Sequence, residues 1–276
     1  MSPFDLIHLQ YPTVGFGASL LPHLLFITTH KKKIITLHEF TQVHILRKLS
    51  INLFKLTKKA SFIFTNNFEM QAFRLGPARV RTIPIGSNIK AFDGCVEKTR
   101  RIINFGLIRP DKGIEDFIEL SRIFRNSGNT KFSFMLCGAT DYRFQDFYNF
   151  IMSQCRDLNI ETAMNLPEKD VARLMCESSF SYLPFPDGAS DRRGSMLAAM
   201  INDCLVLTTL GAHTEPALKK SIIPVSTAND AYKKITEISP EEIKEKLKNS
   251  REYLKKFDWN TVADQHIEIY KEVSEE

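Results

Sequence analysis

The sequence lacks the patterns that would place it in several common protein classes. Its five cysteines form neither a CxxC pair nor a cluster with histidine, which argues against a disulfide framework and favours reduced thiols in a cytosolic protein. No apolar run reaches the roughly 18 residues that cross a bilayer, and residues 1–5 do not begin a secretory signal. We therefore expect a soluble, cytoplasmic protein.

Motifs for metal and nucleic-acid binding are also missing. The histidines have no ligand spacing with Asp or Glu, so the sequence predicts no metal site. It contains no helix-turn-helix, zinc finger or RNP-like segment, which argues against a nucleic-acid partner. The P-loop pattern GxxxxGK[ST] is absent, so a phosphate would have to be bound in another way.

Positive charge is concentrated in the first third of the chain. The net charge is +5, yet residues 1–90 hold 12 Lys and Arg against 3 Asp and Glu, a balance of +9. Residues 91–276 therefore carry −4. Such a basic region could face nucleic acid, an anionic lipid surface or a phosphate-bearing substrate, because the same Coulomb attraction holds all three.

Basic residues within 31–59 surround a predicted helix. Its apolar positions recur at helical spacing, and lysine and arginine occupy the other sides. The helix could lie on an anionic membrane surface and give the protein a peripheral contact at the inner membrane face. A solvated outer face of a core helix is the alternative. The apolar positions are Val43, Leu46, Leu49, Leu53 and Leu56.

Short apolar runs alternate with helical patterns along the chain, which is typical of a parallel β-sheet with helices on its faces. The turn-forming stretch IPIGSN interrupts the pattern, and we place a domain boundary there. The sequence predicts an α/β protein with two doubly wound domains, one in residues 1–88 and one in 89–258. Strands are expected at 5–10, 34–37, 61–65, 80–83, 101–105, 132–137, 161–166, from 181, at 204–208 and at 222–225. Helices are expected at 18–26, 42–58, 67–73, 114–125, 142–156, 168–177, from 194, at 228–236, 240–257 and 260–273.

Four polar segments follow predicted strands: residues 38–39, 106–113, 138–140 and 187–195. The carboxyl ends of parallel strands are where open α/β sheets bind ligands. These segments are therefore the candidates for a binding site, and they include Gly138.

Arg109 and Lys112 share the second of these segments, beside a predicted helix start. A guanidinium can bind two oxygens at once and an ammonium acts as a point charge, so the pair suits a diphosphate. A polar turn with solvated charges is the alternative. The fourth segment carries Asp187, Asp191, Arg192 and Arg193, and a helix begins behind it. Paired arginines and a helix amino end indicate an anion site, with an ordinary surface loop as the alternative.

His38 follows a buried strand and precedes Glu39. A histidine there could hydrogen-bond a sugar hydroxyl or act as a base near neutral pH. A partly buried histidine with satisfied hydrogen bonds is the blander interpretation.

Several segments, in this order, resemble the retaining GT-B glycosyltransferases of family 4 (glycosyl transferases group 1). FGLIRPDKGIEDFIEL resembles the family's phosphate loop, and IPIGSN resembles its interdomain crossover. TLHEF is similar to its N-domain histidine segment, and FDWNTVADQHIEIY to the closing helix, here residues 259–276, that returns to the N-domain. LPEKDVARLMCESSFSYLPF and GSMLAAMINDCLVLTT are similar to the run into its donor-site helix and the following strand.

The resemblance implies a GT-B fold with two Rossmann-like domains and an enzyme, of hexosyltransferase type, that transfers a sugar from a nucleotide-diphosphate donor. It implies retention, no cofactor and no bound metal, and a saccharide or lipid-linked acceptor in cell-surface polysaccharide or glycoconjugate synthesis. Arg109 and Lys112 would neutralise the diphosphate, and His38 would contact the donor sugar. The residues expected to bind the donor sugar or nucleotide are Gly138, Asp191, Arg192, Arg193, Gly194, Ser195, Met196 and Leu197, the last four through their backbone.

Two departures from the family pattern affect these expectations. The family commonly has two glutamates eight positions apart, where this chain has Ser190 and Ala198. The chain also begins in what resembles the later half of the N-domain, so we expect an incomplete N-terminal domain. Either the sequence is shortened, or a second chain or a homo-oligomer completes the domain, or the protein is no longer a competent transferase. A catalytically degenerate or split GT-B protein that acts as a binding or partner subunit is the alternative function.

Overall fold

A computed structural model describes residues 5–17, 19–41, 43–57, 60–75, 80–94 and 96–275. The chain divides into two compact units: residues 1–85 with 256–276 form unit 1, and residues 86–255 form unit 2. Both are α/β with a wholly parallel sheet, as the alternation of strands and helices predicts.

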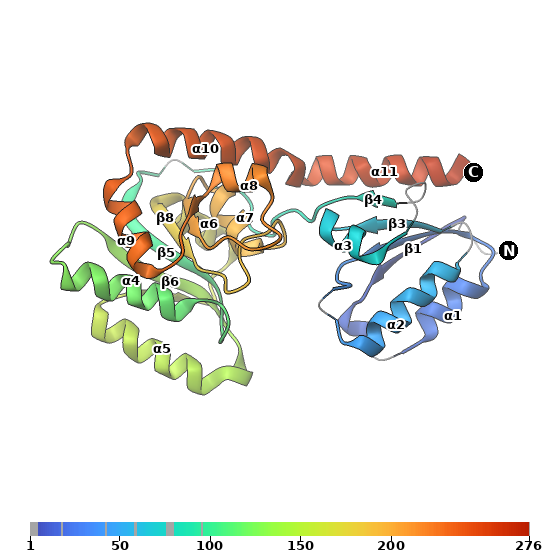
Figure 1. Cartoon of the computed structure of the whole chain (residues 1–276), viewed down its shortest axis with the longest axis horizontal. Coiled ribbons are helices and arrows are strands. Elements are labelled where there is room, and N and C mark those ends of the chain that lie inside the picture. Colours follow the sequence, from blue (N-terminus) through green and yellow to red (C-terminus); the bar gives the residue numbers. More distant parts are fainter. Residues whose placement is uncertain are drawn as a thin grey trace. The chain divides into compact units, whose positions relative to one another are not determined.

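Unit 1 has a four-stranded sheet in the order β1-β2-β3-β4, which is also the order along the chain. In Figure 1, α1 and α2 lie on one face of this sheet and α11 lies on the other. The strands are β1 (Leu6–Tyr11), β2 (Lys32–Leu37), β3 (Ala60–Phe64) and β4 (Val80–Thr82). The helices are α1 (Leu21–Thr28), α2 (Ile45–Leu53), α3 (Asn67–Phe73) and α11 (Trp259–Glu275), with 3-10 turns at Val14–Phe16, Phe54–Leu56 and Lys255–Phe257.

Alternation along the strands of unit 1 divides its core into two layers. Side chains of a strand point alternately to the two faces of the sheet. Ile35 on β2 and Phe62 on β3 therefore pack with Phe26 of α1 on one face. Ile34 on β2 and Ile63 on β3 pack on the other face with Val262, Ile269 and Val273 of α11.

Unit 2 has a six-stranded sheet in the order β10-β9-β8-β5-β6-β7. Helices α4 and α5 cover one face, and α6 and α7 cover the other (Figure 1). The strands are β5 (Thr99–Ile108), β6 (Ser133–Thr140), β7 (Glu161–Met164), β8 (Ser178–Leu183), β9 (Leu205–Thr208) and β10 (Ile223–Pro224). The helices are α4 (Ile114–Asn126), α5 (Gln145–Leu158), α6 (Glu168–Glu177), α7 (Gly194–Ile201), α8 (Pro216–Ser221), α9 (Ala228–Glu237) and α10 (Pro240–Leu254), and a 3-10 turn spans Tyr142–Phe144.

The strand order of unit 2 creates a topological switch point. The chain builds outward from β5 to β6 and β7, then returns to the other side of β5 and continues through β8, β9 and β10. This is the order of the Rossmann fold, in which ligands bind beyond the carboxyl ends of the two strands where the direction changes. In unit 2 those strands are β5 and β8.

Some predicted elements differ from the observed ones. The strand predicted over 101–105 continues to Ile108, so Gly106 lies within β5, and Gly138 lies within β6. Ladder pairing explains both, since Gly106 and Gly138 are directly paired between the two strands. The short helix α8 was not predicted, because it has only six residues and little periodicity.

The helix predicted over 42–58 is shorter in the structure, and most of the apolar positions that predicted it are exposed. The helix α2 begins after His44, whose side chain accepts a hydrogen bond from the Leu46 backbone N–H. The buried side chains are Ile51 and, in the turn that follows, Phe54. The stripe that would face the core if this were a core helix is mostly exposed: Leu46, Leu49, Leu53 and Leu56. This helix has apolar residues on two sides, and spacing alone could not show which side packs on the sheet.

The described cysteines agree with the reduced thiols expected from the sequence. Cys137, Cys155, Cys176 and Cys204 are all free, and burial raises the pKa of Cys137 to about 11. Cys95 lies outside the described residues. Across the described part of the chain, no helix is long and apolar enough to span a membrane.

Candidate donor-binding site of unit 2

Strands β5 and β8 separate at the switch point and their loops bound a common cavity. Asn104 on β5 is buried, and its Nδ2 donates a hydrogen bond to the backbone oxygen of Tyr182 on β8 at 2.8 Å. This bond fixes the two strands to each other just before the loops begin. The loop after β5 carries Arg109 and Lys112, and the loop after β8 leads to Arg192 and Arg193.

Gly113 lies where the loop after β5 contacts the loop after β8. It is the residue before α4 and has a φ of +72°, a conformation that L side chains rarely adopt. A Cβ built on Gly113 would lie 2.1 Å from the backbone oxygen of Pro184, in the loop after β8. Only glycine allows this close approach, which keeps Lys112 beside the second loop.

The second loop is held by its neighbours after β9. Gly188 has a φ of +86° and passes close to the backbone of Gly211. The Ala189 backbone N–H donates to the Thr209 oxygen at 2.8 Å, and the Thr214 hydroxyl donates to the Ala189 oxygen at 2.6 Å. These bonds give the loop a defined shape ahead of the two arginines.

Arg193 combines a fixed position with an unused donor. Its guanidinium lies over the Phe185 ring, 4.6 Å from the ring centroid, and forms an ion pair with Asp187. Its Nε is buried and has no hydrogen-bond partner among the described residues. An unsatisfied buried donor is costly, so this nitrogen favours an acceptor such as a phosphate oxygen.

Helix α7 begins directly behind Arg193 and has no acidic residue in its first turn. The backbone N–H groups at a helix start lack partners within the helix and carry a partial positive charge. Gly194 and Ser195 border the cavity there. Met196 and Leu197 have fully buried side chains, which leaves only their backbone for a ligand.

The cavity at the switch point has a volume of about 540 Å³, in the range of small-molecule sites. Its lining includes the cations Lys112, Arg192 and Arg193 and the apolar residues Leu107, Ala139, Leu166 and Val171. Such a lining suits a ligand with an anionic part and a flat or apolar part. The remaining lining residues are Asn88, Ile89, Asn104, Phe105, Gly106, Gly138, Asn165, Glu168, Leu183, Phe185, Gly194 and Ser195.

The cations of the two loops act on one another. Burial lowers the pKa of the Lys112 ammonium, and the charges of Arg109 and Arg193 lower it further. Asp187 and Asp111 oppose this shift. Because like charges here destabilise each other in the absence of an anion, a bound dianion would relieve the repulsion.

The structure brings together most of the residues that the sequence resemblance predicts to bind a donor. Lys112, Gly138, Arg192, Arg193, Gly194 and Ser195 all line the cavity. Arg109 is outside the lining but close enough to act on Lys112 and on Asp141. Asp191 is also outside the lining; burial first, and then the charges of Glu215 and Asp191, raises the pKa of the Tyr253 phenol of α10.

Sequence reasoning missed Asn165, Leu166 and Glu168. Asn165 follows β7, where its backbone N–H donates to the Gly138 oxygen at 2.7 Å and its side chain accepts from the Thr140 N–H at 3.1 Å. These bonds position the carboxyl end of β6 beside the cavity. The strand predicted over 161–166 hid this position, because β7 ends at Met164 and Asn165 follows it with a positive φ of 54°, which asparagine tolerates better than most residues.

His38 belongs to unit 1, where it directly follows β2. Its Nε2 lies 2.7 Å from the Gln10 Oε1, and its backbone N–H donates to the Tyr11 oxygen at 2.9 Å. Burial lowers its pKa, while Glu39 opposes the shift. The imidazole is therefore neutral near pH 7, which would allow it to accept or donate one hydrogen bond.

Among the described residues, no group of three or more His, Cys, Asp or Glu side chains could hold a metal ion.

No protein-family model matches the chain, and a search of curated proteins finds no match. Solved structures do resemble it. A glycosyltransferase from Rickettsia africae is 18% identical with a TM-score of 0.76, over 98% of this chain and 76% of that one.

Two further structures agree. A sucrose-phosphate synthase from Thermosynechococcus elongatus is 18% identical with a TM-score of 0.72, over 98% of this chain and 74% of that one. HepE of Anabaena, solved in complex with UDP, is 14% identical with a TM-score of 0.77, over 98% of this chain and 79% of that one. This chain has a GT-B-like fold. At these identities the similarity concerns the fold, and the GT-B-like fold predicted from the sequence is confirmed.

Proposed function

We propose that this chain transfers a sugar from a nucleotide-diphosphate sugar to an acceptor, with the retaining outcome and hexosyl donor that the sequence resemblance implies. The observation that carries the proposal is the convergence of Lys112, Arg193 and the amino end of α7 on one cavity at the switch point of unit 2. The glycosyltransferase structures that share the fold support it, and one of them is named as a complex with UDP.

The cations would act on the leaving group. As the bond between the anomeric carbon and the diphosphate oxygen breaks, negative charge grows on the diphosphate. Positive groups held in place before the reaction stabilise that charge without reorganising. Lys112 and Arg193 border the cavity directly, and Arg109 adds to their field from just outside it. We assign the same residues to donor binding and to stabilisation of the departing diphosphate. His38 would contact the donor sugar in this proposal.

Thermal shift with UDP, GDP and their sugars tests the donor assignment, because a ligand that binds only the folded state raises the melting temperature. We expect one nucleotide diphosphate to stabilise the protein. Lys112→Ala should weaken its binding about tenfold or more, since charge-assisted hydrogen bonds are lost. Lys219→Ala, an exposed change on α8, is the matched control and should leave binding unchanged.

Transfer itself is measured separately, with the anomeric configuration of the product read by NMR. A nucleotide shift that Lys112→Ala leaves intact would contradict the phosphate-site assignment. Binding without transfer or donor hydrolysis would favour the alternative function of a binding or partner subunit. One residue favours this alternative function. Ala198 stands where the resemblance would place a glutamate, is buried in α7, and offers no polar group to a ribose.

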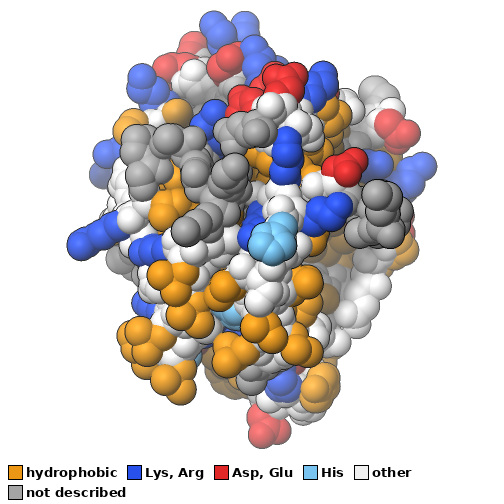
Figure 2. All heavy atoms as spheres, turned by 90° about the vertical axis from the view of Figure 1, so that its right-hand side faces the viewer, with side chains coloured by type: hydrophobic (Ala, Val, Ile, Leu, Met, Phe, Trp, Pro, Cys, Tyr) orange, Lys and Arg blue, Asp and Glu red, His pale blue; other side chains and the backbone are white. Residues whose placement is uncertain are grey.

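We further propose that unit 1 contacts an anionic membrane surface, where a lipid-linked acceptor would be found. Large hydrophobic side chains are exposed along α1 and α2, and Figure 2 shows them gathered on one face with lysine and arginine nearby. Exposed apolar patches of this kind mark interaction sites, and basic neighbours favour anionic lipid. The apolar residues are Leu20, Leu21, Leu24, Leu25, Ile27, Ile45, Leu46, Leu49, Leu53 and Leu56, and the basic ones include Lys31, Lys48 and Lys55.

Flotation with vesicles of neutral lipid, with and without anionic lipid, tests the membrane contact. We expect binding only to anionic vesicles, and Leu21→Ser with Leu46→Ser should abolish it while the melting temperature stays unchanged. Lys219→Glu on unit 2 is the charge control. A second copy of the chain on the same face would instead appear as a dimer in light scattering that the leucine variants dissociate, and that result would contradict the membrane proposal.

A further inference from the structure

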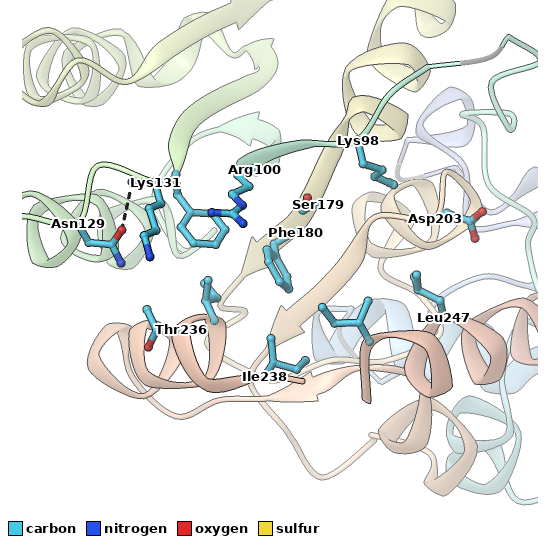
Figure 3. A pocket seen from close by; sticks show the side chains of 13 residues that line it. Lys98, Arg100, Asn129, Lys131, Ser179, Phe180, Asp203, Thr236, Ile238 and Leu247 are labelled. Carbon is cyan, nitrogen blue, oxygen red and sulfur yellow. Dashed lines mark hydrogen bonds between the residues drawn. The ribbon is translucent and has the colours of Figure 1, made fainter. Parts of the chain in front are cut away.

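A second cavity lies at the opposite end of the unit 2 sheet from the switch point (Figure 3). Its volume is about 530 Å³, within the range of small-molecule sites. It is bordered by residues at or next to the amino ends of β5, β6 and β8, and by the segment from the end of α9 into α10. The switch-point cavity shares none of its lining residues, so the two are separate places.

The floor of this amino-end cavity is continuous with the core of unit 2. Phe180 and Ile235 are buried members of the main hydrophobic cluster, and Phe132, Ile238, Ile243 and Leu247 pack against that cluster while remaining partly exposed. An apolar group in the cavity would therefore be added to a core already formed. Removing apolar surface from water in this way favours binding.

The rim of the cavity is cationic. Figure 3 shows Arg100 and Lys131 extending from the sheet side toward the space, with Ile238 and Leu247 on the helical side. In the described part of the chain, no acidic side chain forms an ion pair with Arg100 or Lys131. Lys98 adds a third positive charge, and its ammonium donates to the Ser178 backbone oxygen at 2.9 Å. The two unpaired cations are available to an anion.

Among the described residues that line the cavity, the acidic one, Asp203, is already neutralised. Asp203 accepts two hydrogen bonds from Arg251 of α10, from Nε at 2.8 Å and from a terminal nitrogen at 2.9 Å. This bidentate pairing balances the carboxylate and turns its oxygens to Arg251. The field inside the cavity is therefore set by Arg100, Lys131 and Lys98.

We propose that the amino-end cavity binds an amphiphile with one anionic head group and a short aliphatic chain. The guanidinium of Arg100 and the ammonium of Lys131 hold the head, and the floor formed by Phe180, Ile238 and Leu247 takes the chain. A wholly polar anion would leave the apolar floor exposed to water, and a neutral hydrocarbon would leave the two cations without an anionic partner. The inference concerns a site separate from the donor cavity and does not depend on glycosyl transfer.

Calorimetry with decanoate, below its micelle concentration, tests the site on the full chain. Decanol and decyltrimethylammonium carry alkyl chains of similar length on a neutral and a cationic head group. We expect decanoate to bind about tenfold or more tightly than decanol, from one charge-assisted hydrogen bond, and the cation not to bind. Across hexanoate, octanoate and decanoate, affinity should rise by up to about fourfold for each added methylene. Equal affinity for decanoate and decanol would overturn the proposal.

Variants locate the binding. Arg100→Glu with Lys131→Glu should remove decanoate binding, while Lys219→Glu with Lys220→Glu, an equal charge change on α8, should retain it. Ile243→Glu, which places a carboxylate in the floor, should remove it too, with the fold checked by its melting curve. Lys112→Ala and Leu21→Ser with Leu46→Ser should leave it unchanged. Binding that survives the Arg100 and Lys131 changes, or that is lost equally in the α8 control, would overturn the assignment.

Discussion

The two units use the same parallel architecture but differ in where their strands start. In unit 2 the chain begins in the middle of the sheet, at β5, and builds outward in both directions. In the described part of unit 1 the strand order follows the chain from β1 to β4, without a change of direction. A switch point therefore exists in the described sheet of unit 2 alone, and there the loops after β5 and β8 meet around a cavity.

The helices of the two units also differ, in how many of their apolar side chains are buried. Helix α4 of unit 2 buries one apolar stripe, including Phe117 and Phe124, and presents charged residues outside. In unit 1, α2 buries Ile51 and leaves Leu46 and Leu49 on the surface. Unit 2 thus has a cavity of small-molecule size, whereas unit 1 exposes large apolar side chains on α1 and α2. Changes that act on one unit and spare the other can test this division.

The largest effect is expected at Gly113. Gly113→Ala forces a side chain into a left-handed backbone conformation and against the Pro184 oxygen, so we expect the free energy of unfolding of unit 2 to fall by about 3 kcal/mol or more. Urea unfolding, followed together with nucleotide binding, measures both consequences. Gly106→Ala is the matched control, because a Cβ there meets no atom within 4 Å. Equal stability of the two variants would show that the contact between the loops does not hold unit 2 together.

In unit 1 the largest effect is expected at Glu69. This carboxylate is fully buried and accepts hydrogen bonds from the backbone N–H groups of Phe40 and Thr41 at 2.8 and 2.9 Å, and from the Thr41 hydroxyl at 2.7 Å. Glu69→Ala leaves those donors unpaired, and we expect a loss of about 2–3 kcal/mol in the free energy of unfolding.

Glu69→Gln keeps an oxygen that can accept from both N–H groups, so it should lose less than half as much. Because the loop it fixes directly follows His38, donor turnover by Glu69→Gln and Glu69→Ala should fall in the same order as their stability if that histidine contacts the donor. Chemical denaturation with parallel transfer assays gives both values. Identical losses in the two variants would mean that the carbonyl oxygen contributes little.

Local sequence patterns predicted most of the helices and strands, because the strands are apolar runs and many of the helices have clear starts and ends. The helices at Asn67–Phe73 and Glu168–Glu177 match the predicted ranges completely. Asn66 shows why: its side chain accepts from the Glu69 N–H and caps the first of them. The rule that parallel strands bind ligands at their carboxyl ends was enough to select Lys112, Gly138, Arg193 and Gly194.

Other features could not be predicted because they depend on pairing and packing across the chain. The length of β5 is set by its ladder with β6, which includes Gly106. The exposed side of α2 depends on which stripe meets the sheet, and both stripes are apolar. The amino-end cavity combines Arg100, Lys131 and Leu247 from three distant segments, and none of them carries a local signal. These residues form a cavity only because the fold brings them close together.

A pH effect is expected to separate unit 1 from unit 2. Burial first, and then the charges of His266 and His38, lowers the pKa of His8 from 6.5 to about 4. Between pH 6.5 and about pH 4, His8 is protonated in the unfolded chain but remains neutral in the folded chain. The free energy of unfolding of unit 1 should therefore fall as the pH drops through this window, by about 1–2 kcal/mol for a partly exposed group.

Melting curves between pH 7 and pH 4 measure this dependence. In His8→Gln the slope should be smaller, although the amide can still bond to the Tyr270 hydroxyl and to Thr36, which His8 contacts at 2.7 and 2.8 Å. His213→Gln, in unit 2, is the control and should retain the wild-type slope. If His8→Gln kept the full slope, another group of unit 1 would be responsible for it.

The smallest expected effect concerns the ion pair between Arg251 and Asp203 in unit 2. Both side chains are well exposed, at 63% and 39%, so water screens their attraction despite the bidentate geometry. Arg251→Ala should lower the free energy of unfolding by at most about 1 kcal/mol. It should weaken decanoate binding more clearly, because it leaves the Asp203 carboxylate unbalanced at the edge of the amino-end cavity. Lys255→Ala removes a similarly exposed pair with Glu252 and should affect neither. Calorimetry on the three proteins thus separates a charge that only supports the fold of unit 2 from one that shapes its second cavity.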